Sequence, residues 1–429
     1  MQRYESYKPS GVEWLGDIPD HWKTRQLRWL ADFVERGTAP SYADNGILVI
    51  NQACLSTYEL NLSKAKYHFS KEDFRKSRGL LKKGDILIAS TGRGVLGKCC
   101  FVNSEVEGFV DSHVTIVRDS KGRLPAKFVF YLLSTQYEMI NACLSEGSTN
   151  QTELQRDSFR KIQIPLPPRA EQDRIVTFLD QKTTEIDVAI AKKKRLIELL
   201  QEQKNILINQ AVTRGLNPNV TMRDSGVEWI GEIPKHWQQL RNKALFHQRN
   251  EPGKNDLPIL SVSLHSGISD KEQDETENIR AKVRIQDKTM YKRVYPGDVA
   301  YNMMRAWQGA IGVVRVDGLV SPAYVVAEPR ESINGSYFEY LYRTQGFIRE
   351  MDRYSKGITD FRKRLYWNEF KQLTSLLPPI DEQVQIAAYA DRVLAKTASL
   401  IEKTLVQIEN LHVFRNSLVA AVVTGGTKI

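Results

Sequence analysis

A glycine-rich string in the first half of the chain has the spacing of a phosphate-binding loop. Gly92 to Lys98 fits both the Gly-x-Gly-x-x-Gly of dinucleotide sites and the Gly-x-x-x-x-Gly-Lys of nucleoside triphosphate sites. Either site needs a helix directly after the loop, whereas Cys99–Val102 has the composition of a β-strand. Cys99 also occupies the place of the serine or threonine that binds magnesium. We therefore predict a turn between two strands, where the backbone and basic side chains can still approach a phosphate.

Other catalytic and metal-binding patterns are weak. The seven histidines form no His-Glu-x-x-His pair, and neither half contains a Gly-x-Ser-x-Gly elbow. Two acidic-x-Lys strings, Asp180–Lys182 and Glu202–Lys204, resemble part of some nuclease sites, but surface charge on a helix is the ordinary explanation. The basic run Lys192–Arg195 is typical of a solvated helix face, with a nucleic-acid or partner contact as the alternative. The sequence predicts no catalytic residue, cofactor or metal on this chain.

Side chains suited to DNA contacts lie in four predicted loops. They offer the bidentate or flexible hydrogen bonds that bind base edges and phosphates, and for each of them an ordinary solvated loop position is the alternative. The candidates are Thr91, Arg93 and Lys98 in the glycine-rich loop, Asn302, Arg305 and Gln308 in its second-half counterpart, and Thr149, Asn150, Gln151, Lys356, Thr359 and Arg362 before the last strand of each half.

Two long helical segments must position these loops. The first runs from Arg169 to Gly215, begins after Pro167-Pro168 and is uninterrupted by proline or glycine. Its apolar residues recur at the a and d positions of a heptad, so the helix needs a partner. The seam that we predict comprises Val176, Leu179, Ile186, Ile190, Ile197, Leu200, Leu207 and Ala211 on this helix, and Leu394, Ile401, Ile408, Leu411, Leu418 and Val422 on a second helix at the end of the chain.

The second helix belongs to an internal duplication. Leu166-Pro-Pro, Glu171-Gln172 and Gly215 all recur 211 positions later, the glycine as Gly426. The segment Ser10–Trp22 returns as Ser225–Trp237 with ten of thirteen residues identical, which chance does not produce. We interpret the tryptophans of this block as structural anchors. Polar residues also interrupt the seam at matching places, Lys193 with Thr404 and Lys204 with Arg415, either as register or partner markers or as solvated edge positions.

Each half also contains a globule of mixed secondary structure. We expect strands at 47–50, 85–89, 99–102 and 109–117 in the first half, and at 299–302, 310–316 and 319–326 in the second. One helix is expected over 126–144 and one over 337–353. Between these landmarks the two halves differ widely. The predicted fold class is α+β, with globules at 1–165 and 216–376 and coiled-coil helices at 166–215 and 377–429.

Composition agrees with a protein of several units that binds a polyanion. At 429 residues the chain is too long for one ordinary core, and Lys+Arg 61 against Asp+Glu 51 gives a net charge of +10. Four cysteines without metal-ligand spacing, Cys54, Cys99, Cys100 and Cys143, and no secretory leader are consistent with a reducing cytoplasm. The chain contains no apolar run long enough for a membrane span.

The doubled architecture resembles the DNA specificity subunits of type I restriction-modification enzymes. The resemblance rests on the Gly-x-Glu-Trp-x-Gly and Ile-Pro-x-x-Trp block that opens each half, and on Ile164–Pro168 with Glu171-Gln172 leading into the helix. The resemblance implies two target-recognition domains, each binding one half of a split double-stranded DNA site. It also implies an antiparallel helix pair that acts as a spacer and docks methyltransferase subunits. Because the internal repeat gives the helix pair a pseudo-twofold axis, two such subunits are expected. Restriction and translocase subunits would join through these, and S-adenosylmethionine and ATP would bind the partners.

Two other functions stay open at this stage. One is a nucleotide-dependent nuclease or translocase that uses Gly92 to Lys98, which ATP binding by the isolated chain would support. The other is a coiled-coil scaffold that binds protein only, for which binding would not depend on salt. The DNA-binding hypothesis predicts an asymmetric target, because the two globules differ, and a spacer that changes with helix length.

Overall fold

The computed structural model describes residues 2–56, 58–69, 78–92, 94–146, 152–264, 267–269, 287–357 and 363–429. The chain divides into two compact units: unit 1 consists of residues 1–193 and 406–429, and unit 2 of residues 194–405. Two long helices, α5 (Arg169–Arg214) and α10 (Ile380–Val423), contribute to both. Unit 1 therefore contains the start of α5 and the end of α10, and unit 2 contains the end of α5 and the start of α10. The predicted fold class, with two mixed globules and a pair of long helices, is confirmed.

Unit 1 is built around a four-stranded antiparallel sheet in the order β11-β10-β13-β4. A second sheet, β12-β6-β9-β5, contains the parallel pair β12–β6. Its strands are β1 (Tyr7–Pro9), β2 (Asp17–Pro19), β3 (Lys23–Gln26), β4 (Phe33–Arg36), β5 (Tyr42–Ala43), β6 (Ile47–Ile50), β7 (Leu55–Ser56), β8 (Glu59–Leu60), β9 (Lys66–His68), β10 (Ile86–Ala89), β11 (Cys99–Phe101), β12 (Gly108–Val110), β13 (Val114–Arg118), β14 (Ser145–Glu146), β15 (Glu153–Leu154) and β16 (Gln163–Leu166). Its shorter helices are α1 (Leu27–Leu30), α2 (Ala126–Ser134), α3 (Tyr137–Cys143) and α4 (Arg156–Arg160).

Unit 2 repeats this scaffold with a sheet in the order β20-β27-β24-β25. In both units a strand next to the Leu-Pro-Pro pairs with one that follows the tryptophan block, β16 with β3 and β28 with β19. Its strands are β17 (Met222–Asp224), β18 (Glu232–Pro234), β19 (Gln238–Arg241), β20 (Phe246–Arg249), β21 (Val262–Ser263), β22 (Gly267–Ile268), β23 (Lys292–Val294), β24 (Val299–Asn302), β25 (Ile311–Val313), β26 (Gly318–Val320), β27 (Tyr324–Pro329) and β28 (Thr374–Leu377). Its shorter helices are α6 (Asn242–Leu245), α7 (Gly335–Tyr342), α8 (Gln345–Tyr354) and α9 (Trp367–Phe370).

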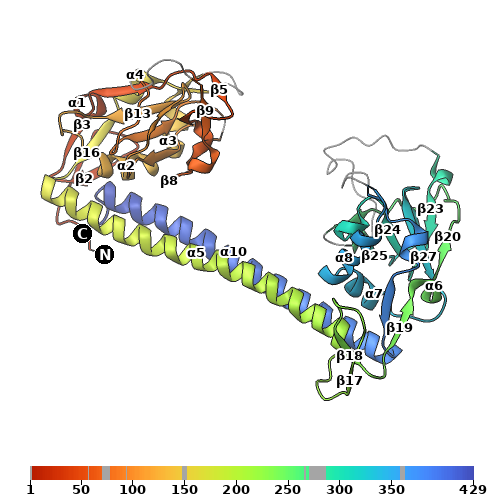
Figure 1. The fold of residues 1–429 in the computed structure, drawn as a ribbon. Helices are drawn as coiled ribbons and strands as arrows, with labels where there is room; N and C mark the ends of the chain where they lie inside the picture. Colours follow the sequence, from red (N-terminus) through yellow and green to blue (C-terminus); the bar gives the residue numbers. More distant parts are fainter. Residues whose placement is uncertain are drawn as a thin grey trace. The chain divides into compact units, whose positions relative to one another are not determined.

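The two long helices end inside the cores of the units. In unit 1 the last turns of α10, with Leu418 and Val422, are buried in the same apolar cluster as Ile175 and Leu179 of α5. There α10 lies alongside α5 (Figure 1). Unit 2 buries Val212 of α5 and the early turns of α10 in its own cluster. Packing against a globule therefore adds to the stability that the heptad seam provides. None of the described helices is long and apolar enough to cross a lipid bilayer.

Several predicted elements are divided in the structure. The strand expected over 109–117 is β12 and β13, because Asp111 accepts a hydrogen bond from the backbone of His113 (2.9 Å) and forms a tight turn. The strand expected over 319–326 is likewise β26 and β27, with Ser321-Pro322 between them, and the strand expected over 310–316 is reduced to β25. Each single helix expected after the sheets is a pair, α2–α3 and α7–α8. In unit 2 the side chain of Thr344 caps the second helix by accepting from Phe347 N (3.3 Å).

Candidate nucleic-acid interface

The recurring tryptophan block of unit 1 holds the first turn of α5. The carboxylate of Glu171 accepts hydrogen bonds from the hydroxyl of Tyr4 (2.6 Å) and Nε1 of Trp22 (3.3 Å), and it lies 2.8 Å from Nε2 of His21. Burial opposes ionisation of this carboxyl, but these hydrogen bonds outweigh it, so the pKa of Glu171 lies below its ordinary value. Trp22 is completely buried. The block therefore acts as a structural anchor for the helix.

Unit 2 repeats this anchor with its own residues. Glu382, in the first turn of α10, accepts a hydrogen bond from Nε1 of Trp237 (2.9 Å) and lies 2.6 Å from Nε2 of His236. The C-terminal end of α5 packs against the ring of Trp237 as well. Gly215, which follows α5, lies so close that a Cβ there would be 3.2 Å from this ring. Each anchor thus joins the start of one long helix to the end of the other.

The glycine that ends α10 differs from the predicted one. Gly425 has a φ of 83°, like the 75° of Gly215, and a Cβ there would lie 2.3 Å from Cδ of Pro19 in the tryptophan block. Gly426, the counterpart expected from the 211-residue spacing, has no such contact. The structural equivalent of Gly215 is therefore Gly425, and α10 itself ends at Val423, two residues before the end that the gapless repeat predicts from α5.

The predicted seam residues lie at buried or partly buried positions within their units. Leu179, Ile186, Ile190, Ala211, Ile408, Leu418 and Val422 are buried, and Val176, Ile197, Leu200, Leu207, Leu394, Ile401 and Leu411 are partly buried. In unit 1 Lys193 contacts Gln407 (2.7 Å) and Asp187 contacts Arg415 (2.8 Å). From Asp187 to Lys193 the residue numbers of α5 increase, while those of their partners on α10 decrease from Arg415 to Gln407. The two helices are therefore antiparallel in unit 1.

Two of the polar interruptions on the seam are buried in the structure, Arg415 in unit 1 and Thr404 in unit 2. The guanidinium of Arg415 is 10 % exposed, pairs with Asp187 and lies 3.9 Å from the ring centroid of Tyr58 on the globule. Thr404 is buried and donates to the carbonyl of Leu400 (2.7 Å). Arg415 therefore marks a register position, since only one axial position of α10 brings it to both partners.

The glycine-rich loop of unit 1 joins two antiparallel strands, as predicted. It connects β10 to β11, which pair from Ile86 with Phe101 to Ile88 with Cys99. Gly92 and Gly97 have φ values of 93° and 89°, which favour glycine. Because a strand follows the loop, its amides are not those of a helix start, and the geometry of a nucleotide-binding loop is not formed. Lys98 is partly buried at the end of the loop.

Three polar side chains meet where the strands of unit 1 end. Thr91 follows β10, Gln52 follows β6, and His113 precedes β13. The hydroxyl of Thr91 donates to Oε1 of Gln52 (3.0 Å) and lies 2.8 Å from Nδ1 of His113. Neither Gln52 nor His113 is among the residues that the sequence singled out. They come from different loops: the pairing of β10 with β13 brings His113 to Thr91, and the packing of β6 in the same apolar cluster brings Gln52 there.

The corresponding loop of unit 2 joins β24 to β25 through a short 3₁₀ turn, Ala306–Gln308. Asn302 ends β24, and its side chain accepts from Met304 N (2.9 Å). Arg305 and Gln308 are exposed on the turn. Lys356 is also exposed, with its Nζ 2.5 Å from a carboxylate oxygen of Glu369.

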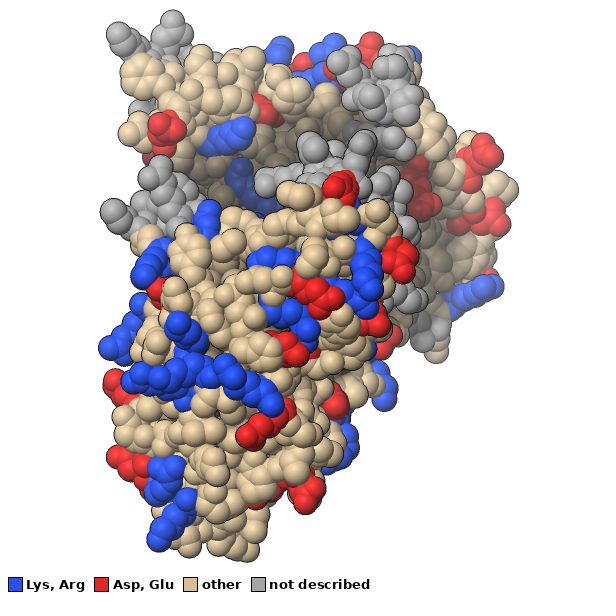
Figure 2. All heavy atoms as spheres, turned by 90° about the vertical axis from the view of Figure 1, so that its right-hand side faces the viewer, with Lys and Arg blue, Asp and Glu red and all other residues tan. Residues whose placement is uncertain are grey.

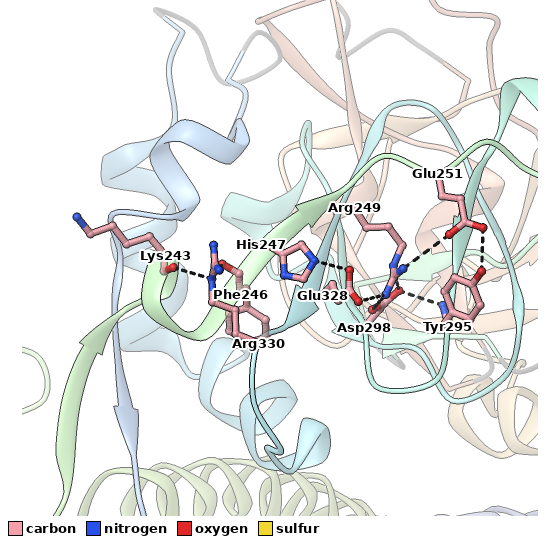
Figure 3. Close-up of polar contacts among 9 residues, drawn as sticks. All are labelled: Lys243, Phe246, His247, Arg249, Glu251, Tyr295, Asp298, Glu328 and Arg330. Carbon is pink, nitrogen blue, oxygen red and sulfur yellow. Dashed lines mark hydrogen bonds and ion pairs between the residues drawn. The ribbon is translucent and has the colours of Figure 1, made fainter.

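An arginine-centred cluster positions β24 in unit 2 (Figure 3). Arg249 on β20 lies 3.0 Å from Asp298 and 2.7 Å from Glu328, and its guanidinium is 4.6 Å from the ring centroid of Tyr295. Burial raises the pKa of Asp298, against the effects of the backbone amide of Tyr295 and of Arg249. Asp298 also accepts a hydrogen bond from that amide (3.0 Å), so the cluster holds the turn from which β24 begins.

Unit 1 holds the equivalent turn from another strand. Asp85 accepts from the backbone of Lys82 (2.8 Å) and pairs with Arg118 of β13 at 2.6 Å. In unit 2 the arginine that meets the equivalent aspartate comes from β20, which corresponds to β4. The scaffold is therefore duplicated, while the side chains on its strands are rearranged.

One face of the molecule carries charged side chains of both signs. Figure 2 shows acidic and basic side chains interspersed on the face in view, with basic side chains gathered in places. Within the described ranges, no group of His, Cys, Asp and Glu side chains could hold a metal ion.

Known proteins share this architecture. Residues 19–201 match the model of the type I restriction modification DNA specificity domain. A putative type I restriction enzyme MjaX specificity subunit from Methanocaldococcus jannaschii is 22 % identical over 97 % of this chain and 96 % of its own length. The first part of the chain is thus similar to this specificity domain, and the chain as a whole is similar to specificity subunits. A further relative is the EcoKI specificity subunit of Escherichia coli K12, 24 % identical over 76 % of this chain and 72 % of its own.

Solved structures of specificity subunits have the same fold. The HsdS subunit from Thermoanaerobacter tengcongensis has a TM-score of 0.52 and 18 % identity, covering 96 % of this chain and 98 % of its own. A chain from a structure of type I R-M complex assembly and conformational transition has a TM-score of 0.62 and 16 % identity, covering 95 % and 98 %. The chain thus shares the fold of these two solved structures.

Part of the predicted DNA interface falls outside the described residues. These positions are Arg93, Thr149, Asn150, Gln151, Thr359 and Arg362. Five described candidates lie in or beside the loop that joins a central strand to an edge strand of each sheet, β10 to β11 and β24 to β25: Thr91, Lys98, Asn302, Arg305 and Gln308. The sixth, Lys356, lies just after α8. As DNA contacts they stay predictions.

Proposed function

We propose that this chain is the non-catalytic specificity subunit of a type I restriction-modification enzyme and recognises a bipartite, asymmetric DNA target. Each unit would bind one half of the target, and α5 with α10 would act as the spacer. Helices suit this role because a helical segment is stiffer than a flexible linker. The match of residues 19–201 to the DNA specificity domain and the similarity to specificity subunits support DNA recognition.

One observation carries the assignment of two different half-sites. The two units share their sheet order and their helix anchors, yet equivalent positions at the strand ends carry different side chains. Selection for packing alone does not require such a contrast on a common scaffold. Different base edges require different patterns of donors, acceptors and apolar contacts, so two dissimilar surfaces bind two dissimilar half-sites.

The same proposal assigns the chemistry to partner subunits. Methyltransferase subunits would dock on the helix pair, and the internal duplication offers two similar docking faces, which supports two copies. Restriction and translocase subunits would join the complex through them. S-adenosylmethionine and ATP would bind these partners, so the specificity subunit would supply the choice of sequence alone.

Mapping of methylated bases tests the proposal directly. The chain is expressed with its methyltransferase partner in cells without other methyltransferases, and the genome is sequenced by a method that detects base modification. We expect one split motif with two different halves and a fixed spacer. A palindromic motif, or methylation without sequence preference, would contradict it. Purified chain that binds and hydrolyses ATP unaided would instead favour the enzyme alternative.

A further inference from the structure

The Thr91, Gln52 and His113 side chains form a hydrogen-bonded chain whose direction is set by chemistry. Thr91 has a single hydroxyl proton, and it donates this proton to Oε1 of Gln52 at 3.0 Å. The contact of 2.8 Å between the same hydroxyl and Nδ1 of His113 therefore has the imidazole as donor. The order is His113 Nδ1–H to Thr91 Oγ1–H to Gln52 Oε1. Both outer side chains are thus held in one orientation.

This arrangement leaves base-reading groups available. Oε1 of Gln52 has a second lone pair, and in the described part of the chain Nε2 of Gln52 makes no hydrogen bond. Gln52 and Thr91 are partly exposed and His113 is exposed. The backbone comes close on one side of the amide, since a Cβ on Gly92 would lie 3.2 Å from Nε2 of Gln52. The amide is therefore confined to one plane while its edge stays accessible.

The turn beneath His113 is also fixed. Asp111 is 1 % exposed, and burial raises its pKa against the backbone hydrogen bond from His113. Its two carboxylate oxygens accept from His113 N (2.9 Å) and from the hydroxyl of Tyr42 (3.3 Å). Ser90 N donates to the carbonyl of His113 (2.8 Å), which ties this turn to the end of β10. All three side chains of the hydrogen-bonded chain are thus carried on rigid strand ends.

We infer that Gln52, held by Thr91 and His113, contacts one base pair in the half-site bound by unit 1, with adenine as the preferred base. A glutamine amide binds adenine through two hydrogen bonds, donating to N7 and accepting from N6. For these two bonds Gln52 has the N–H groups of Nε2 and the second lone pair of Oε1, while the hydrogen bond from Thr91 to Oε1 fixes the orientation of the amide. The inference rests on the proposed function and names a specificity-determining residue within it.

Unit 2 supports the inference by contrast. Backbone hydrogen bonds identify the equivalent positions: Met303 N donates to the carbonyl of Ala323 (3.4 Å) just as Ser90 N does to that of His113. By this register His113 corresponds to Ala323 and Thr91 to Met304. The bridge of Ile259 with Leu319, which matches that of Val49 with Phe109, places Val262 at the position of Gln52.

At all three positions, unit 2 therefore has apolar side chains in place of the hydrogen-bonded chain of unit 1. Apolar side chains contact thymine methyl groups and cannot bind adenine in this way. The equivalent positions of the two units thus differ in hydrogen-bonding capacity, which is the property that distinguishes one base edge from another.

The test uses the full chain assembled with its methyltransferase subunits and reads the methylated motif. Gln52→Ala is expected to relax one base position in one half of the motif, by about fivefold to about 150-fold in preference, and to leave the other half unchanged. Thr91→Val, which keeps shape but removes the hydroxyl, should relax the same position less, and Thr91→Ser should retain the preference. Asn103→Ala is the matched control, because Asn103 is an exposed amide beyond the other end of β10 and β11.

The outcomes separate this inference from the function on which it depends. A wild-type complex that methylates without a split motif contradicts the proposed function itself. A wild-type split motif that Gln52→Ala leaves intact, or relaxes equally in both halves, overturns only the role of Gln52. A relaxed position that prefers a base pair other than adenine-thymine in the wild type overturns the assigned base. Melting temperatures of the variants show that the change in preference is not a loss of fold.

Discussion

Replacing Glu171 by glutamine tests whether the tryptophan block anchors the long helix. The glutamine keeps the shape of the side chain but removes the charge from a group that is 9 % exposed and contacts three partners, Tyr4, His21 and Trp22. Hydrogen bonds to a charged group contribute about 1.5–3 kcal/mol each and neutral ones about 1 kcal/mol. Summed over three contacts, we expect Glu171→Gln to lower the stability of unit 1 by roughly 2–4 kcal/mol.

Glu382→Gln is the matched control in unit 2. Its carboxylate is 35 % exposed and has two partners, His236 and Trp237, so its replacement should cost only about 1–2 kcal/mol. Amide hydrogen exchange measured peptide by peptide distinguishes the two units, because each variant should lower protection in its own unit. The anchor interpretation is wrong if Glu171→Gln leaves unit 1 unchanged, or if either variant weakens both units equally.

The pH dependence gives a second check on the same residue. The pKa of Glu171 is lowered in the folded state, so the ionised carboxylate stabilises the fold above the ordinary glutamate range. This contribution is lost as the pH falls through that range, about pH 4–5, towards the lowered pKa. The difference in unfolding free energy between the wild type and Glu171→Gln should therefore be constant near neutral pH and shrink in acid. A difference that grows in acid would contradict the assigned cause.

Three further predictions concern the helix ends, the glycine-rich loop and the spacer. Gly425→Ala should destabilise unit 1 by more than about 2 kcal/mol, because φ is 83° and the new Cβ would overlap Pro19, whereas Gly426→Ala should change the unfolding free energy by less than about 0.5 kcal/mol. The purified wild-type chain should bind ATP no better than the Lys98→Ala variant, both at the level of a non-binding control. ATP binding by the wild type that Lys98→Ala abolishes would revive the nucleotide alternative. Inserting one heptad into each of the long helices, α5 and α10, lengthens the helix pair by about 10 Å. At about 3.4 Å per base pair, the spacer of the methylated motif should then grow by about 3 base pairs. Methylation at only the original spacing would refute the spacer role.

Much of the architecture follows from local sequence signals. The Pro-Pro pair and the uninterrupted heptad place the start of α5 at Arg169, and Gly215 places its end, because helix capping and apolar periodicity depend on neighbours in the chain. The repeat at a spacing of 211 residues predicts a second helix and a second globule. The strand that follows Gly92 to Lys98 argues against a nucleotide loop without any coordinates.

Local sequence patterns gave the wrong boundary where a strand or helix ends because of one side chain and its contacts. Apolar residues on both sides concealed the turns at Asp111 and Ser321, where a side-chain hydrogen bond to the backbone competes with the strand. The gapless repeat likewise pointed to Gly426, while contact with Pro19 selects Gly425. These outcomes depend on which backbone amides and neighbours are within reach, and spacing alone carries no such information.

The sequence by itself determined the doubling, the two long helices and the loops in which recognition residues are expected, since periodicity, capping and repetition are properties of the chain. Only the tertiary structure decided which distant side chains share a surface. Gln52 and His113 lie 39 and 22 residues from Thr91 in the chain. They meet because β10 pairs with β13 and β6 packs in the same apolar cluster as these strands, so the ends of β6 and β10 lie beside the start of β13. Such pairing and packing join segments that are far apart in sequence.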